Sequence, residues 1–305
     1  MLGFSLSADG VTTPISTLTL PTDFDATSIA VDPNSGTIYV GGQTYSGAEE
    51  GTYLIYAYAA GASGNATPLR MITTSILQVM GIWTYMTVDQ AGQLYLLTGI
   101  DLTPLVTVYS PTASGSATPV RQFSAGVYAP WAIAIDNSQN VYVLSQDANT
   151  PVNGTNIRTG IINEYPSTGS GTLAPLRTIT DGANYFLGIT VDANDNLYLT
   201  RMTTNSANPG AGDINPTVVE YAAGATAAAT PTKTISGSLT GFYSLGAIKV
   251  DSKGNLYVGN ANGSTAGTYY LLGFAPTATG NAAPVLSLSS STWGGSGSGL
   301  QFDIK

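Results

Sequence analysis

One short phrase recurs six times along this chain: an apolar residue, a variable and usually small residue, a second apolar residue and aspartate. The first copy is Ile29-Ala30-Val31-Asp32, followed after a short turn by Ile38-Tyr39-Val40. Four more copies keep both halves, and Leu300-Gln301-Phe302-Asp303 is a sixth, cut off by the chain end. The aspartates at 32, 89, 136, 192, 251 and 303 are separated by 57, 47, 56, 59 and 52 residues. A period this long, rich in β-branched and aromatic residues, predicts one four-stranded sheet per repeat and so a β-propeller.

Between these copies, an aromatic residue is followed ten positions later by proline. The six pairs are Phe4 and Pro14, Tyr58 and Pro68, Tyr109 and Pro119, Tyr165 and Pro175, Tyr221 and Pro231, and Phe274 and Pro284. The intervening Gly, Ser, Ala and Thr residues are typical of a connection between antiparallel strands, and proline suits the start of an outer strand. Each repeat is therefore predicted to hold four strands, named A to D from the centre outward. We expect Glu164 and Glu220 on strand C to pair with Arg177 and Lys233 on strand D.

The strand count predicts a single all-β domain over residues 1–305. Strands C and D come first, five complete A–D blades follow, and a strand A ends the chain. We therefore expect a six-bladed β-propeller of four-stranded antiparallel blades, the last closed by the N- and C-terminal strands. The expected blades cover 27–75, 84–125, 131–181, 187–237, 246–290, and 298–305 with 1–22. The sixth blade lacks an evident strand B, so it has three strands or a missing segment.

The composition excludes several functional classes. The formal net charge is −9 and the nine Lys and Arg residues are scattered, so nothing predicts nucleic-acid binding. His and Cys are both absent, which removes imidazole bases, thiolate nucleophiles and the metal sites that they build. The sequence shows no membrane span and no signal peptide. A charged fraction of only 9%, with abundant Ser, Thr and Gly, favours an extracellular or cell-surface location.

The repeat resembles that of the NHL-repeat propellers. The similarity is clearest at residues 188–192, Gly-Ile-Thr-Val-Asp, followed by residues 196–199, Asn-Leu-Tyr-Leu. Residues 64–72, Gly-Asn-Ala-Thr-Pro-Leu-Arg-Met-Ile, resemble a phrase of bacterial secreted repeat proteins. The wider superfamily includes gluconolactonase-like enzymes, amidating lyases and binding modules for proteins or sugars, so the resemblance implies the fold and leaves the function open.

The residues that form the catalytic sites of that superfamily are not found at the corresponding positions of this sequence. A gluconolactonase-like site needs Glu, Asn and Asp side chains that converge on one metal in the channel, and an amidating lyase needs histidines. The corresponding inward positions here are Ala, Thr, Lys and Gln: Ala30, Thr87, Ala134, Thr190, Lys249 and Gln301. No catalytic residue is therefore predicted.

The repeated aspartates and tyrosines are predicted to be framework. Each Asp is expected to accept hydrogen bonds from N–H groups of the A–B turn, and each strand B Tyr to pack between sheets. The alternative is a calcium array, for which residues 192–196, Asp-Ala-Asn-Asp-Asn, are the best candidate. No cofactor or metal ligand is assigned.

The candidate ligand-binding residues are aromatic residues in or near the D–A connections, together with one lysine. Those connections should gather around the channel mouth, where aromatic rings can stack on sugars or grip apolar side chains. The candidates are Phe24, Trp83, Tyr85, Tyr128, Trp131, Tyr185, Phe186, Phe242, Tyr243, Trp293 and Lys249. The alternative for the rings is packing between blades. Lys249 replaces the small residue of the strand A phrase. One interpretation is a functional lysine, acting as a nucleophile or contacting a ligand. The other is an amine that reaches channel water or a neighbouring carbonyl.

Three functions remain. The first is a non-catalytic bacterial binding or structural module that recognises a glycan or peptide at the channel mouth. The second is a lactonase or lyase that uses a divalent cation such as Ca²⁺, held by acidic residues of the B–C loops: Glu49, Glu50, Asp101, Asp147 and Asp213. The alternative for these acids is that they are simply solvated loop charges. The third is a self-assembling subunit whose sixth blade accepts a strand from another chain.

Overall fold

A computed structural model describes most of the 305 residues. The described ranges are 1–5, 9–11, 13–44, 52–77, 83–99, 104–126, 130–152, 155–181, 184–203, 214–227, 229–262, 268–290 and 302–304. Side chains are described for these ranges except 75–77, 83, 146–152, 155–158, 262, 268 and 290. Within these ranges, no helix has the length and apolar character needed to cross a membrane.

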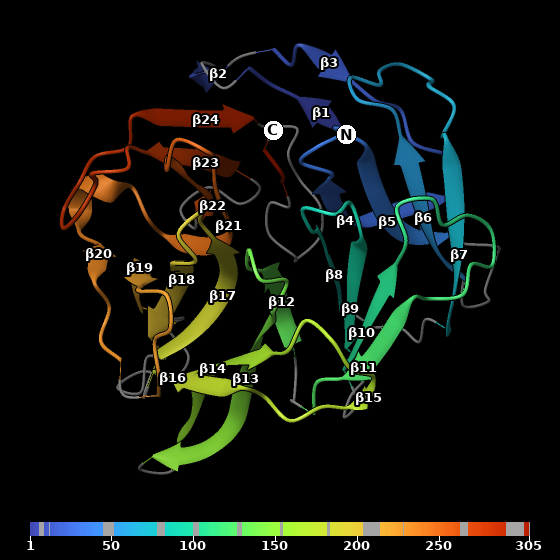
Figure 1. The fold of residues 1–305 in the computed structure, drawn as a ribbon. Helices are drawn as coiled ribbons and strands as arrows, with labels where there is room; N and C mark the ends of the chain where they lie inside the picture. The colour runs from blue at the N-terminus through green and yellow to red at the C-terminus, as the bar shows by residue number, and fades with distance from the viewer. Residues whose placement is uncertain are drawn as a thin grey trace.

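Five four-stranded antiparallel sheets are arranged in a ring (Figure 1). We number them as blades 1–5 in chain order. Blade 1 consists of β4 (Phe24–Val31), β5 (Ile38–Thr44), β6 (Thr52–Tyr58) and β7 (Arg70–Leu77), and blade 2 of β8 (Trp83–Val88), β9 (Leu94–Gly99), β10 (Leu105–Tyr109) and β11 (Arg121–Ser124). Blade 3 consists of β12 (Pro130–Ile135), β13 (Val141–Val152), β14 (Thr155–Tyr165) and β16 (Arg177–Thr180), and blade 4 of β17 (Asn184–Val191), β18 (Leu197–Thr203), β19 (Ile214–Tyr221) and β20 (Lys233–Ile235). Blade 5 consists of β21 (Ser244–Val250), β22 (Leu256–Asn262), β23 (Thr268–Phe274) and β24 (Leu286–Ser290). The prediction of a β-propeller with four-stranded antiparallel blades is confirmed.

The core lies between neighbouring sheets and is built by the two recurring aromatic positions. The strand B tyrosines of blades 1–3 are at most 2% exposed: Tyr39, Tyr95 and Tyr142. The aromatic residues that end strand C are equally buried: Tyr58, Tyr109, Tyr165, Tyr221 and Phe274. Large buried rings on a strict repeat hold one sheet against the next, because each contributes a large apolar area.

The C–D connections of blades 1, 2, 3 and 5 reach back to the outer strand of the preceding unit. At four of these junctions a glycine is held by two backbone bonds or a short parallel ladder: Gly64 pairs with Leu18, Gly115 with Ile72, Gly171 with Phe123 and Gly280 with Ile235. The φ angles of these glycines lie between 60 and 80°, a region that side chains disfavour. This contact, which we call the clasp, explains the glycine that stands four residues before proline in these four connections.

The first residues of the chain form a smaller unit between blades 5 and 1 (Figure 1). Strands β1 (Leu2–Gly3) and β3 (Ser16–Thr17) pair as a two-stranded sheet, and β2 (Gly10–Val11) pairs with β24 as a clasp. Ile15 donates its N–H to the Gly3 carbonyl at 2.8 Å, as Leu69 does to the Ala57 carbonyl in blade 1. This closing unit, β1 to β3 with residues 302–304, therefore reproduces a C–D hairpin.

The predicted strand A of the sixth blade, at 298–305, is not seen as a strand. Residues 302–304 are described and have no strand pairing, while 298–301 and 305 lie outside the described residues. Asp303 instead accepts the Val31 N–H of blade 1 at 2.8 Å through Oδ2. Among the described residues 302–304, it is thus a side chain that holds the chain to blade 1.

Candidate functional site

The propeller has two unlike faces. Because strand direction alternates within each blade, the A–B and C–D connections lie on one face and the B–C and D–A connections on the other. We call these the turn face and the loop face. The B–C hairpin of blade 3, formed by β13 and β14, projects well beyond the ring in Figure 1.

On the turn face, the repeated aspartates cap the A–B turns as predicted. Asp192 Oδ1 accepts the N–H groups of Asn194 and Asn196 at 2.8 and 2.9 Å, and its Oδ2 accepts the Asn196 amide and the Tyr198 hydroxyl. Asp89, Asp136 and Asp251 are bonded in the same way. This bonding pattern gives each aspartate a turn-capping role.

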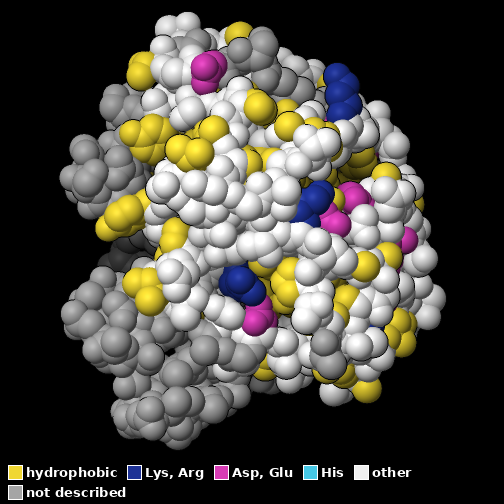
Figure 2. All heavy atoms as spheres, turned by 90° about the vertical axis from the view of Figure 1, so that its left-hand side faces the viewer, with side chains coloured by type: hydrophobic (Ala, Val, Ile, Leu, Met, Phe, Trp, Pro, Cys, Tyr) yellow, Lys and Arg dark blue, Asp and Glu magenta, His cyan; other side chains and the backbone are white. Residues whose placement is uncertain are grey.

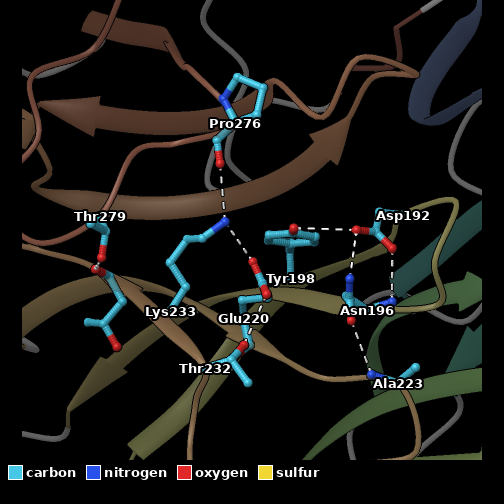
Figure 3. A network of polar contacts seen from close by, with 10 residues as sticks. Asp192, Asn196, Tyr198, Glu220, Ala223, Thr232, Lys233, Pro276 and Thr279 are labelled. Atoms are coloured by element: carbon cyan, nitrogen blue, oxygen red, sulfur yellow. Dashed lines mark hydrogen bonds and ion pairs between the residues drawn. The ribbon is translucent and has the colours of Figure 1, made fainter.

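In blades 3 and 4 the caps continue into a chain of polar contacts across the blade. In blade 4 Tyr198 hydrogen-bonds to both Asp192 and Glu220. Glu220 pairs with Lys233, which binds the Pro276 carbonyl of blade 5 at 3.1 Å (Figure 3). The expected Glu220–Lys233 pair, at 2.8 Å, and the Glu164–Arg177 pair are both present. Arg70 and Arg177 donate to the strand B hydroxyls of Tyr39 and Tyr142.

For the calcium alternative, the described residues contain no group of three or more acidic side chains able to hold a metal ion. Of the loop acids, Glu49, Glu50, Asp101 and Asp213 lie outside the described residues, and the side chain of Asp147 is not described.

Three of the candidate aromatic residues are packed in the core. Phe24 is 9% exposed and meets Tyr56 edge-on at 4.9 Å, while Tyr185 and Phe186 are 2% and 0% exposed. The expectation that these rings line an open mouth is wrong, because β4 and β17 extend further toward the loop face than the repeated phrase suggests. The rings are strand residues that pack between sheets.

The other rings differ in exposure. Tyr85 and Trp131 are half-buried against core clusters, and burial raises the pKa of the Tyr85 hydroxyl. Phe242 packs against Phe274 at 5.2 Å. Tyr243 is 56% exposed, and its N–H is held at 2.8 Å by the amide oxygen of buried Asn260. Trp83 has only its backbone described, and Tyr128 and Trp293 lie outside the described residues.

Lys249 lies at the turn-face end of β21, away from the other candidates. Its Nζ is 3.5 Å from Asp303 Oδ1, and the other oxygen of Asp303 holds the Val31 N–H. The lysine thus joins blade 5 to the chain end and, through it, to blade 1. The ion pair gives Lys249 a structural partner, and its role as a ligand contact stays a prediction.

A polar cluster that the sequence reasoning missed lies on the loop face where blades 3 and 4 meet. Arg201 Nη1 contacts Asp181 Oδ2 at 2.7 Å, and both side chains are about one-fifth exposed. Asn184 donates to Asp181 Oδ1 at 2.9 Å and accepts from the Thr203 hydroxyl at 2.7 Å. The Tyr221 hydroxyl also reaches Asp181, at 3.3 Å. We call these four residues, Asp181, Asn184, Arg201 and Thr203, the Asp181–Arg201 cluster.

One sequence signal could have found this cluster. Arg201 stands three residues after the strand B Tyr, where the other blades have Gly42, Thr98, Ser145 and Asn260. The basic residues Arg70, Arg121, Arg177 and Lys233 instead share one repeat position, at the start of strand D. Arg201 is therefore a charge that the repeat does not explain.

The equivalent junction of blades 1 and 2 is closed differently. Fully buried Tyr53 places its hydroxyl 2.8 Å from Thr84 Oγ1 and 2.9 Å from Ser28 Oγ. Burial raises the pKa of Tyr53, which keeps this group neutral. Neutral hydroxyls thus seal one junction, whereas a partly exposed ion pair occupies the other.

No protein-family model and no curated protein matches the sequence. Among solved structures, a protein of unknown function from Bacteroides caccae shares 10% identity and a TM-score of 0.56, covering 90% of this chain and 85% of that chain. A protein of unknown function from Dyadobacter fermentans shares 9% identity and a TM-score of 0.52, covering 84% and 81%. At this identity the likeness establishes the β-propeller fold alone.

Proposed function

We propose that this chain is a non-catalytic binding module that recognises a glycan or an extended peptide on its loop face. The observation that carries the proposal is the Asp181–Arg201 cluster, a partly exposed charged group that the repeat does not require. Exposed Tyr243 and half-buried Trp131 stand on the same face. Variable connections above a rigid scaffold are where propellers and other folds place binding residues.

We propose further that the ring has six blade positions and is of the NHL type. The closing unit supports this, because it makes clasps on both sides: Gly10 pairs with Leu288 of blade 5, and Leu18 pairs with Gly64 of blade 1. An extracellular or bacterial surface location is proposed from the low charge, and the side seen in Figure 2 is mostly uncharged with scattered charged groups.

The binding proposal predicts that a glycan and peptide array yields a ligand whose binding depends on loop-face rings. The double variant Trp131→Ala/Tyr243→Ala should bind at least about tenfold more weakly, since each lost ring contact costs about 1 kcal/mol. The control is Val285→Ala, which truncates a side chain 70% exposed at the outer edge of blade 5. Unchanged binding in a double variant that circular dichroism shows to be folded would contradict the loop-face location.

A second candidate function is self-assembly, favoured by the two-stranded sheet that β1 and β3 form in the described part of the closing unit, where each of blades 1–5 has four strands. A strand from a second copy could complete this sheet by main-chain pairing. Multi-angle light scattering should then give a dimer or larger species at micromolar concentration. A monomer at every concentration measured contradicts stable strand exchange.

A further inference from the structure

The geometry points to the Asp181–Arg201 cluster as a binding site for a neutral oligosaccharide. This inference rests on the proposed binding function and specifies both its location and its ligand class. Arg201 lies on the central strand β18, and its side chain contacts the carboxylate of Asp181 at the D–A connection. Neither the caps nor the clasps use this residue.

The cluster is fixed before any ligand arrives. Asn184 and Thr203 are cross-strand partners at the loop-face ends of β17 and β18, and their side chains bond at 2.7 Å. The Asp181 carboxylate is held from three sides, by Arg201, Asn184 and the Tyr221 hydroxyl. Side chains locked by mutual hydrogen bonds on strands lose little entropy on binding, which favours recognition of a polar ligand.

The cluster is electrically neutral and rich in donors. Asp181 offsets the charge of Arg201, so the site does not call for an ionic ligand. A guanidinium carries five N–H groups, and within the described residues one nitrogen of Arg201, Nη1, bonds to the cluster. Asn184 uses one of its two amide hydrogens in the same way. Uncharged oxygen acceptors, such as the hydroxyl, ring and glycosidic oxygens of a sugar, match this arrangement.

Aromatic side chains pack between blades 3 and 4 near the same junction. Trp131, at the start of β12, packs half-buried against the core cluster that contains Phe186. Phe186 is the cross-strand partner of Arg201. Gly160 of β14 fits this ring closely, since a Cβ there would overlap Phe186, and the Asp181 N–H points to the Gly160 carbonyl. Trp131 thus packs on the same core cluster as the ring opposite Arg201, and an indole can stack on the apolar face of a pyranose.

A peptide fits this site less well than a sugar. Extended peptides bind chiefly by adding a strand to a free sheet edge or by filling apolar pockets. The strand that carries Arg201 and Thr203 has both edges paired, by β17 and by β19. A basic peptide would also meet the Arg201 charge, and an acidic one would approach a protein of net charge −9.

The test is titration of the whole chain with cellohexaose, chitohexaose, laminarihexaose and xylohexaose, followed by Trp fluorescence and calorimetry. Arg201→Gln should weaken binding of the recognised sugar at least about tenfold, because hydrogen bonds to charged groups are strong. Lys253→Gln, the matched loss of one charge on an exposed turn-face residue, should leave binding unchanged. Thr203→Val is the second variant should Arg201→Gln fail to fold, and it should weaken binding about threefold or more.

The outcomes separate this inference from the binding function itself. Sugar binding that Arg201→Gln and Thr203→Val leave intact overturns the site. Binding of a peptide but of none of the four sugars, lost in Trp131→Ala/Tyr243→Ala, overturns the ligand class while the loop-face binding function stands. Binding of neither sugars nor peptides overturns both. Sugar binding lost in both cluster variants and kept in Lys253→Gln supports the inference.

Discussion

The turn face and the loop face of this propeller are ends of the same strands, yet they are organised on different principles. On the turn face an aspartate caps the A–B turn of every complete blade, and in blades 1, 2, 3 and 5 a glycine of the C–D connection clasps the preceding unit. On the loop face two junctions differ among the described residues: the blade 1–2 junction holds buried hydroxyls, and the blade 3–4 junction holds an ion pair.

This difference shows what the repetition is for. Residues that recur in every blade are satisfied by one another and leave little bonding capacity for a ligand, as Asp192 and its four donors illustrate. Residues that break the repeat, such as Arg201 and Tyr243, are free to serve a purpose of one blade only. Departures from the repeat are therefore a better guide to function than the repeat itself.

The largest expected effect tests whether loop-face aromatic residues belong to the scaffold. Phe186→Ala should lower the free energy of unfolding by about 3–5 kcal/mol, because it empties a fully buried site between blades. Tyr243→Ala should change it by no more than about 0.5 kcal/mol, since the ring is 56% exposed and the backbone bond to Asn260 remains. Urea unfolding followed by circular dichroism measures both.

The pair of variants distinguishes two kinds of aromatic residue that look alike in the sequence. Equal losses of stability would contradict the division into core and surface rings. A small loss for Phe186→Ala would mean that β17 does not pack against blade 3 as the contact with Gly160 indicates.

The sequence was sufficient to predict the propeller, the capping aspartates, the buried tyrosines and the Glu–Arg and Glu–Lys pairs. These features obey spacing rules, so each copy confirms the others. The aromatic mouth was not predictable, because strand A begins well before the repeated phrase: β17 starts at Asn184, five residues before Ile189. Those extra residues place Tyr185 and Phe186 within the sheet.

Contacts between residues that lie far apart in the sequence could not be predicted either. Lys249 is explained by Asp303, 54 residues later in the numbering, and Asp181 meets Arg201 across a D–A connection and a full strand pair. Neither pair follows a repeated spacing. Only the departure of Arg201 from the pattern of strand B could have drawn attention to it.

A smaller effect tests the repeated unit of the turn face. Asp136→Ala should cost about 2 kcal/mol, because Asn140 loses both of its bonds and the 1% exposed Tyr142 loses an acceptor. The control is Ser138→Ala, an exposed residue of the same turn, which should be within about 0.5 kcal/mol of the parent. Thermal unfolding by calorimetry measures the difference, and equal melting temperatures for the two variants would contradict the capping role.

The smallest predicted effect is on the loss of stability at acidic pH. Burial alone would raise the pKa of Glu220, but hydrogen bonds from Lys233, Tyr198 and Thr232 outweigh it and hold the pKa below its ordinary value. A carboxylate with a depressed pKa stabilises the fold above its unfolded-state pKa, near 4.3, and that stability is lost as pH falls through the folded value. Below about pH 5, Glu220→Gln should therefore lose stability less steeply than the parent, by less than about 1 kcal/mol in total because the pair is partly exposed.

Thr232→Val, which removes one of the three bonds to Glu220, should fall between Glu220→Gln and the parent in urea titrations at pH 7 and pH 4. Parallel curves for all three proteins would mean that the polar chain of Figure 3 contributes nothing to acid sensitivity, and that the turn face owes its stability to the caps and clasps alone.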